Sequence, residues 1–195
     1  DAFLAGLTSL QQGGAPVIFV GGAVILAHMR MAQGRLHDAA AIYQRALRLA
    51  LAGADGAGAV RTAQGEYVLQ GTAELYLGLS ELALEQGDVA RARAHLHHGR
   101  ALGEQASLPG FEYLWCVVEA RLRQAAGDGE GALTWLDAAE RLYYRSPIPN
   151  VQPIDAQKVR IWVAQGRLAE AQRWAQVRGR SVADEQGYLR EYEQI

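Results

Sequence analysis

The sequence predicts an all-α fold, a superhelix of stacked antiparallel helix hairpins. Four glycines each separate two stretches of helical apolar periodicity: Gly34, Gly87, Gly127 and Gly166. An alanine stands five residues after each of them. Glycine suits the end of a helix because it adopts the left-handed conformation at low cost. One hairpin cannot bury its own apolar face, but stacked copies can, so the repeated motif favours a solenoid.

The order of the elements follows from these glycines and from the breaks between them. We expect hairpins at roughly 17–51, 66–106, 111–145 and 153–180. Asp88 and Asp128 follow two of the glycines and suit helix N-termini. A Gly/Ala-rich linker at 52–60 and a proline-rich one at 145–153 separate hairpins.

The two ends of the sequence are interpreted as partial helices. Residues 1–16 are expected to form the last helix of a preceding hairpin, and the amphipathic stretch at 188–195 has no stop signal. We therefore interpret residues 1–195 as a single helical-repeat domain and as a fragment of a larger protein.

Composition excludes several classes of partner. The net charge of −2 gives no field that would attract nucleic acid or an anionic membrane. Cys116 is the only cysteine, so no internal disulfide is possible and a cytoplasmic location is expected. The apolar stretch at 15–27 is shorter than the roughly 20 residues that a membrane-spanning helix needs, which favours a buried helix.

The repeat resembles the tetratricopeptide repeat, with alanine five residues and often a bulky residue nine residues after the glycine. The glycines are 53, 40 and 39 residues apart (87 − 34, 127 − 87, 166 − 127), against about 34 in that family. Together with "LALEQGDVARARAHLHHGRALGEQ" (82–105) and "AEAQRWAQVRGRSVADEQGYLREYEQ" (169–194), this longer form resembles the helical-repeat region of MalT-like, LuxR-family ATP-dependent transcriptional regulators.

The resemblance implies a sensor region between an ATP-binding switch domain and a C-terminal helix-turn-helix domain. In such a protein a small-molecule inducer or a protein partner binds the repeats and, with ATP, favours self-association and activation of transcription. No cofactor is then expected in this fragment, since ATP and DNA would be bound by other domains. The alternative is a protein-interaction scaffold that holds a peptide or a helix in its concave groove.

No motif in the sequence indicates catalysis or a metal. Gly21 and Gly22 lack the Lys-Ser/Thr that completes a phosphate-binding loop. Of the histidines at 95, 97 and 98, only two share a side of a helix, which is too few for a metal site, so they are interpreted as surface residues. Cys116 lies in an apolar helix, where a thiol packs as a small hydrophobic group.

The first helix of each hairpin should line the concave side and supply the binding residues. Counted back from each glycine, the sixth position places four polar side chains in a row: His28, Glu81, Arg121 and Arg160. Glu74, Gln124 and Tyr113 are further candidates. Guanidinium groups in such a row bind carboxylate or phosphate oxygens well. The row is equally compatible with a solvated surface.

The aromatic residues are expected to lie mostly in the core. They stand among apolar neighbours at helical spacing, as gap-filling side chains do. The exceptions that we consider are Tyr113 and one of the adjacent pair Tyr143 and Tyr144, which are difficult to bury together. An exposed ring there would stack on a sugar or anchor a helix.

Overall fold

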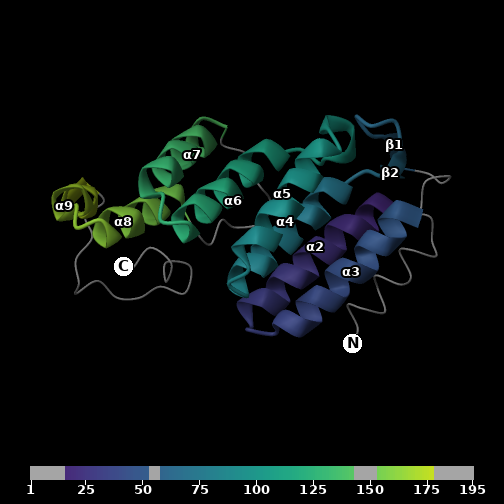
Figure 1. Ribbon diagram of the computed structural model, residues 1–195, viewed down its shortest axis with the longest axis horizontal. Helices are drawn as coiled ribbons and strands as arrows, with labels where there is room; N and C mark the ends of the chain where they lie inside the picture. Colours follow the sequence, from purple (N-terminus) through teal and green to yellow (C-terminus); the bar gives the residue numbers. More distant parts are fainter. Residues whose placement is uncertain (1–15, 53–57, 143–152, 178–195) are drawn as a thin grey trace. The chain divides into compact units, whose positions relative to one another are not determined.

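The computed structural model describes residues 16–52, 58–142 and 153–177. These residues contain eight α-helices, a short 3₁₀ helix and one two-stranded sheet (Figure 1): α2 (Pro16–Ala32), α3 (Leu36–Ala52), β1 (Ala59–Arg61), β2 (Tyr67–Leu69), α4 (Thr72–Glu85), α5 (Val89–Ala101), η1 (Glu104–Ala106), α6 (Phe111–Ala125), α7 (Gly129–Arg141), α8 (Ile154–Ala164) and α9 (Leu168–Val177). The helices pack as antiparallel pairs, which confirms the all-α fold class. The chain divides into two compact units, one ending at Phe111 and the other beginning at Glu112.

The turns inside the helix pairs have the predicted chemistry. All four repeat glycines adopt a positive φ: 72° at Gly34, 76° at Gly87, 79° at Gly127 and 72° at Gly166. In two of the turns an aspartate then caps the next helix. A side-chain oxygen of Asp88 accepts the backbone N–H of Arg91 at 2.9 Å, and Asp128 accepts that of Gly131 at 2.8 Å. Both N-caps are therefore confirmed.

The small residues of the motif lie where two helices approach. The alanines five residues after the first three glycines are fully buried: Ala39, Ala92 and Ala132. Ala27 and Ser80, seven residues before Gly34 and Gly87, are also fully buried. The Ser80 hydroxyl donates to the backbone oxygen of Ala92 at 2.8 Å, which satisfies a buried polar group and ties α4 to α5.

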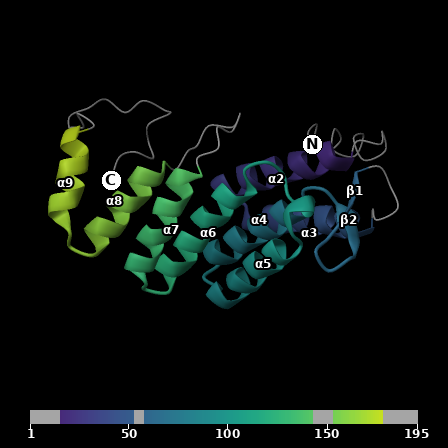
Figure 2. The ribbon, with the colours of Figure 1, turned by 90° about the horizontal axis from the view of Figure 1, so that it is seen from above.

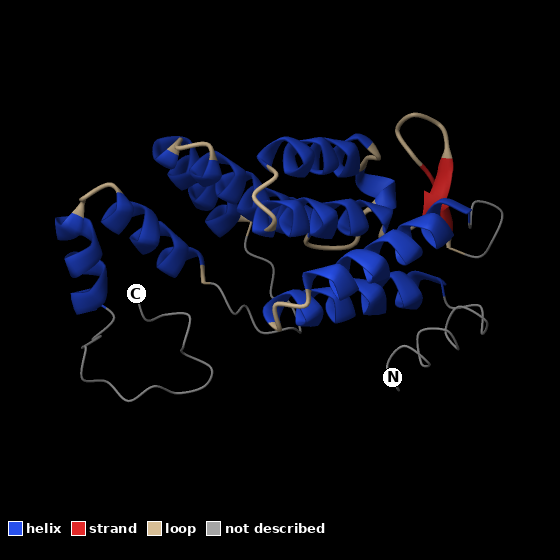
Figure 3. Ribbon diagram, turned by 60° about the horizontal axis from the view of Figure 1, so that its bottom comes forward, coloured by secondary structure: helices blue, strands red, loops and turns tan. Residues whose placement is uncertain are grey.

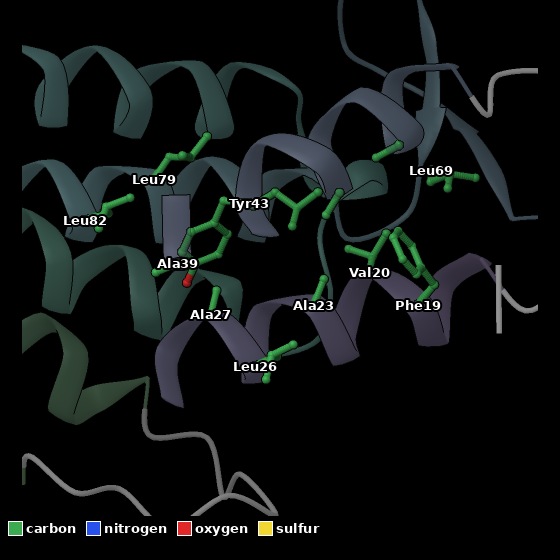
Figure 4. Packing of buried hydrophobic residues seen from close by; sticks show 13 residues of the cluster. Phe19, Val20, Ala23, Leu26, Ala27, Ala39, Tyr43, Leu69, Leu79 and Leu82 are labelled. Carbon is green, nitrogen blue, oxygen red and sulfur yellow. The ribbon is translucent and has the colours of Figure 1, made fainter. Parts of the chain in front are cut away.

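The core of the first unit forms where α2, α3 and α4 meet (Figure 4). Leu26 comes from α2, Tyr43 from α3 and Leu79 from α4, and each is at most 4% exposed. Gly78 of α4 lies directly against the Tyr43 ring, so the missing side chain of a glycine makes room for a tyrosine. Leu69 extends the same cluster to strand β2.

A β-hairpin that no pattern in the sequence predicted precedes α4 (Figure 3). Its register pairs Ala59 with Leu69 and Arg61 with Tyr67. Its turn contacts the end of α5, since the backbone N–H of Ala63 donates to the oxygen of Leu102 at 3.0 Å. The Gly/Ala-rich linker expected at 52–60 therefore includes the first residues of β1. The strand was not predicted, because three residues are too short to show a period of two.

The second unit contains the helices α6 to α9 (Figure 2), and aromatic and charged contacts join them. The rings of Trp115 on α6 and Trp135 on α7 meet edge to face, with centroids 4.9 Å apart. The Trp174 indole N–H on α9 donates to a carboxylate oxygen of Asp155 on α8 at 3.3 Å. No helix of the described ranges is long and apolar enough to cross a membrane.

Lys158 of α8 joins α8 to α7 by two ion pairs. Its Nζ lies 2.6 Å from Asp137 Oδ1 and 2.7 Å from Glu140 Oε2, and its side chain is 12% exposed. Both carboxylates are exposed, so solvent screens the attraction. We expect Lys158→Met to lower the free energy of unfolding by about 1 kcal/mol, less at high salt.

Urea denaturation at low and at high salt measures this effect, with Arg160→Met as the matched control. Arg160 lies two residues further along the same helix and is exposed. Equal losses for the two variants at both salt concentrations would contradict a stabilising role for the ion pairs.

Candidate functional site

Two residues of the predicted polar row meet in the first unit. His28 of α2 and Glu81 of α4 are 53 residues apart in the sequence, and the His28 Nε2–H donates to Glu81 Oε2 at 2.8 Å. The side chain of His28 is 42% exposed and that of Glu81 is 17% exposed. They meet because Ala27 and Ser80, the residues just before them, are small and buried and let the helices approach.

Tyr43 of α3 packs against this pair. Its ring meets the His28 ring edge to face, with centroids 6.2 Å apart, and its side chain is fully buried. Burial and, to a smaller extent, the charge of Glu81 raise the pKa of Tyr43 well above its ordinary value, so the phenol stays protonated. Its hydroxyl has no hydrogen-bond partner among the described residues.

Together these three residues form an imidazole–carboxylate pair above a buried phenol. Part of the His28 side chain is exposed, while the Glu81 carboxylate holds its ring in place. Such an arrangement is suited to binding a polar or anionic group. In the sequence Tyr43 is the bulky residue of the repeat nine positions after Gly34, and this shared position is the signal that it faces the first helices.

Glu74 lies two helical turns before Glu81 on α4, and it is buried. Its carboxyl is 5% exposed, and Oε1 accepts the backbone N–H of Leu108 at 2.7 Å. Oε2 is buried and has no hydrogen-bond partner among the described residues. Burial raises the pKa of this carboxyl to about 7, against the lowering effect of the Leu108 hydrogen bond. Glu74 therefore faces the segment after α5 and is not part of an exposed row.

The remaining candidates belong to the second unit. Arg121 on α6 is half-buried, whereas Gln124 on α6 and Arg160 on α8 are exposed. Tyr113 is 8% exposed and offers a ligand no open ring. Tyr143 and Tyr144 lie outside the described residues.

The histidine-rich stretch of α5 makes aromatic contacts. The rings of His95 and His98 lie 6.2 Å and 4.8 Å from the ring of Tyr76 on α4. Burial, together with the charge of Arg91, lowers the pKa of His95. In the part of the chain that the structure describes, no three His, Cys, Asp or Glu side chains gather where they would hold a metal ion. The Cys116 side chain is buried.

Comparison with known proteins identifies the repeat. Residues 2–195 match the family model described as the MalT-like TPR region. The match covers nearly the whole chain, including both helix pairs of each unit. No curated protein and no solved structure matches the chain.

Proposed function

Because the chain belongs to the MalT-like TPR regions, helical-repeat domains of a non-catalytic binding type, we propose that it is the sensor region of a bacterial LuxR-family transcriptional activator. In this role the repeats bind an inducer or a partner protein in the cytoplasm, and binding controls self-association. ATP and DNA are contacted by other domains of the full-length regulator.

The observation that carries this proposal is the contact of His28 with Glu81. Both occupy the same position of the repeat, six residues before the turn glycine, on the first helices of successive pairs. A polar pair at a helix crossing stabilises little when it is partly exposed, since such pairs contribute about 0–1 kcal/mol. A role in recognition explains why polar residues occupy this position.

A ligand can switch such a protein only by binding one arrangement of its helices better than another. His28 and Glu81 come from different helix pairs, so a ligand that contacts His28 also senses how α2 lies on α4. The proposed site therefore includes a contact whose geometry depends on the packing of neighbouring repeats.

The proposal predicts a ligand-dependent stability increase that requires His28. We would screen the chain by thermal shift against sugars, nucleotides, amino acids and short peptides. A ligand at a hundred times its dissociation constant should add about 2.7 kcal/mol to the free energy of unfolding. We expect His28→Ala to weaken the apparent affinity for the ligand at least tenfold, which removes about 1.4 kcal/mol of the added stability.

His37→Ala is the matched control, since His37 is exposed on α3, the second helix of the same pair. It should leave the shift unchanged. A hit that both variants retain would place the site elsewhere, and Arg121→Ala and Arg160→Ala would then test the second unit.

A second function, a scaffold for a partner helix, is favoured by the outer face of α2. Ile18, Ile25 and Met29 are 62%, 38% and 49% exposed, and their spacing of seven and four residues puts them on one side of the helix. An apolar helix face of this kind suits another amphipathic helix. Ile25→Glu should abolish capture of such a partner and leave a small-molecule thermal shift intact.

A further inference from the structure

The segment that follows α5, residues 102–110, is attached to the beginning of α4, and we call it the connector. The backbone N–H of Gly71 donates to the oxygen of Ala106 at 3.0 Å, and the Gln70 side-chain amide donates to the oxygen of Ser107 at 3.3 Å. The third attachment is the hydrogen bond from the Leu108 N–H to Glu74, the shortest of the three at 2.7 Å. The connector leads directly into α6.

Of these attachments, only the one at Glu74 involves an ionisable group. One carboxyl oxygen is used by Leu108, and the other is buried and unpartnered among the described residues. A buried carboxylate with one unsatisfied oxygen is costly, whereas the neutral acid avoids burying a charge. The strength of the attachment therefore depends on whether Glu74 carries a proton.

Two titratable groups of α2 and α3 are engaged further along α4. His28 of α2 bonds to Glu81, and Tyr43 of α3 lies against Gly78. Neither His28 nor Tyr43 is among the causes of the Glu74 pKa shift, which are burial and backbone hydrogen bonds.

No titratable group of α5, the β-hairpin or the connector is among the causes of the Glu74 pKa shift. His95 and His98 of α5 lie against Tyr76, on another side of α4. Glu66 of the β-hairpin and Glu104 of η1 are exposed. No cation among the described groups contributes to the shift, so burial dominates it.

We propose that Glu74 is a proton-dependent latch that holds the connector on α4 when its carboxyl is neutral and loosens it when the carboxyl ionises. The latch is separate from the proposed ligand site at His28, and its test does not depend on a ligand. The connector belongs to the first compact unit, which ends at Phe111, the residue directly after it.

The direction of the pH effect follows from the two states of the latch. Attached, the Glu74 carboxyl has a pKa of about 7, and released into water it returns towards its ordinary 4.5. Ionisation therefore favours the released state as pH rises between these values. Between pH 5 and pH 8 the equilibrium constant for release should increase about 70-fold.

Amide hydrogen exchange of the whole 195-residue chain measures this equilibrium. After correction for the intrinsic rate at each pH, protection of the Leu108 amide should fall with rising pH in the wild type. In Glu74→Gln, which keeps the acceptor and cannot ionise, protection should be independent of pH. Glu104→Gln, an exposed carboxyl of the same connector, is the matched control and should behave as the wild type does.

Equal pH dependence in the wild type and in Glu74→Gln would overturn the proposal. If Glu74→Gln does not fold, side-chain carboxyl ¹³C titration of the wild type decides the question. A Glu74 resonance that titrates near pH 7 together with the Leu108 amide resonance supports the latch. A resonance that titrates near the ordinary value, or a Leu108 amide that does not follow it, contradicts the latch.

Discussion

Replacing Gly78 with alanine is expected to lower the free energy of unfolding by about 2 kcal/mol, although alanine stabilises an ordinary helix by about 1 kcal/mol relative to glycine. A Cβ on Gly78 would overlap the ring of Tyr43, well inside van der Waals contact. Tyr43 is fully buried, so other atoms of the core surround its ring. Either the ring or α3 must shift, and overpacking of a core costs about 1–3 kcal/mol or more.

Chemical denaturation of three variants isolates the cause. Gly21→Ala is the matched control, because Gly21 also lies inside a helix and a Cβ there meets nothing within 4 Å. It should be neutral or stabilising. In a Tyr43→Leu background the cost of Gly78→Ala should disappear, since the smaller side chain leaves room. A Gly78→Ala variant as stable as Gly21→Ala would show that α3 and α4 are not closely packed at this point.

The helix pairs were predictable because their signals are local. Each turn needs a glycine at a positive φ, and each close approach needs a small residue at a fixed distance from it. Sequence spacing alone therefore located Gly87 and Ala92, and it also identified the cap at Asp88. The same register placed His28 and Glu81 at equivalent positions, so the sequence predicted that they belong to one row of polar side chains.

What the sequence did not reveal depends on contacts between distant residues. The burial of Glu74 arises from the segment at Leu108, 34 residues away, and no local pattern encodes that distance. The exposure of Met29 has a similar origin. The equivalent residues of the three later pairs are buried: Leu82, Leu122 and Ile161. In contrast, α2 is the first described helix and has no described pair before it.

The β-hairpin illustrates a different limit. Its strands have three residues each and follow a Gly/Ala-rich stretch, so neither length nor alternation distinguished them from a linker. Its position is fixed instead by hydrogen bonds to the end of α5 from the Ala63 backbone N–H and the Gln64 side-chain amide. Short elements that are stabilised by tertiary contacts leave little trace in periodicity.

The second large effect that we expect is a pH-dependent loss of stability caused by Glu74. Its carboxyl has a pKa of about 7 in the folded protein against an ordinary value of 4.5. The stabilisation is fully present below the lower value, where the carboxyl is protonated in both states, and it is lost as pH rises through the higher one. The total change is about 3 kcal/mol, because one pKa unit corresponds to 1.36 kcal/mol.

The difference in unfolding free energy between wild type and Glu74→Gln, followed from pH 4 to pH 8, measures this contribution. Subtraction is needed because His95, whose pKa is lowered by burial, has the opposite effect and stabilises the folded state as pH rises. That effect is common to both proteins and cancels. The wild type should lose stability relative to Glu74→Gln as pH rises, most steeply between pH 4.5 and pH 7. A difference that is constant over this range would mean that the Glu74 carboxyl is hydrated in the folded protein, and the connector would then be attached by its other hydrogen bonds alone.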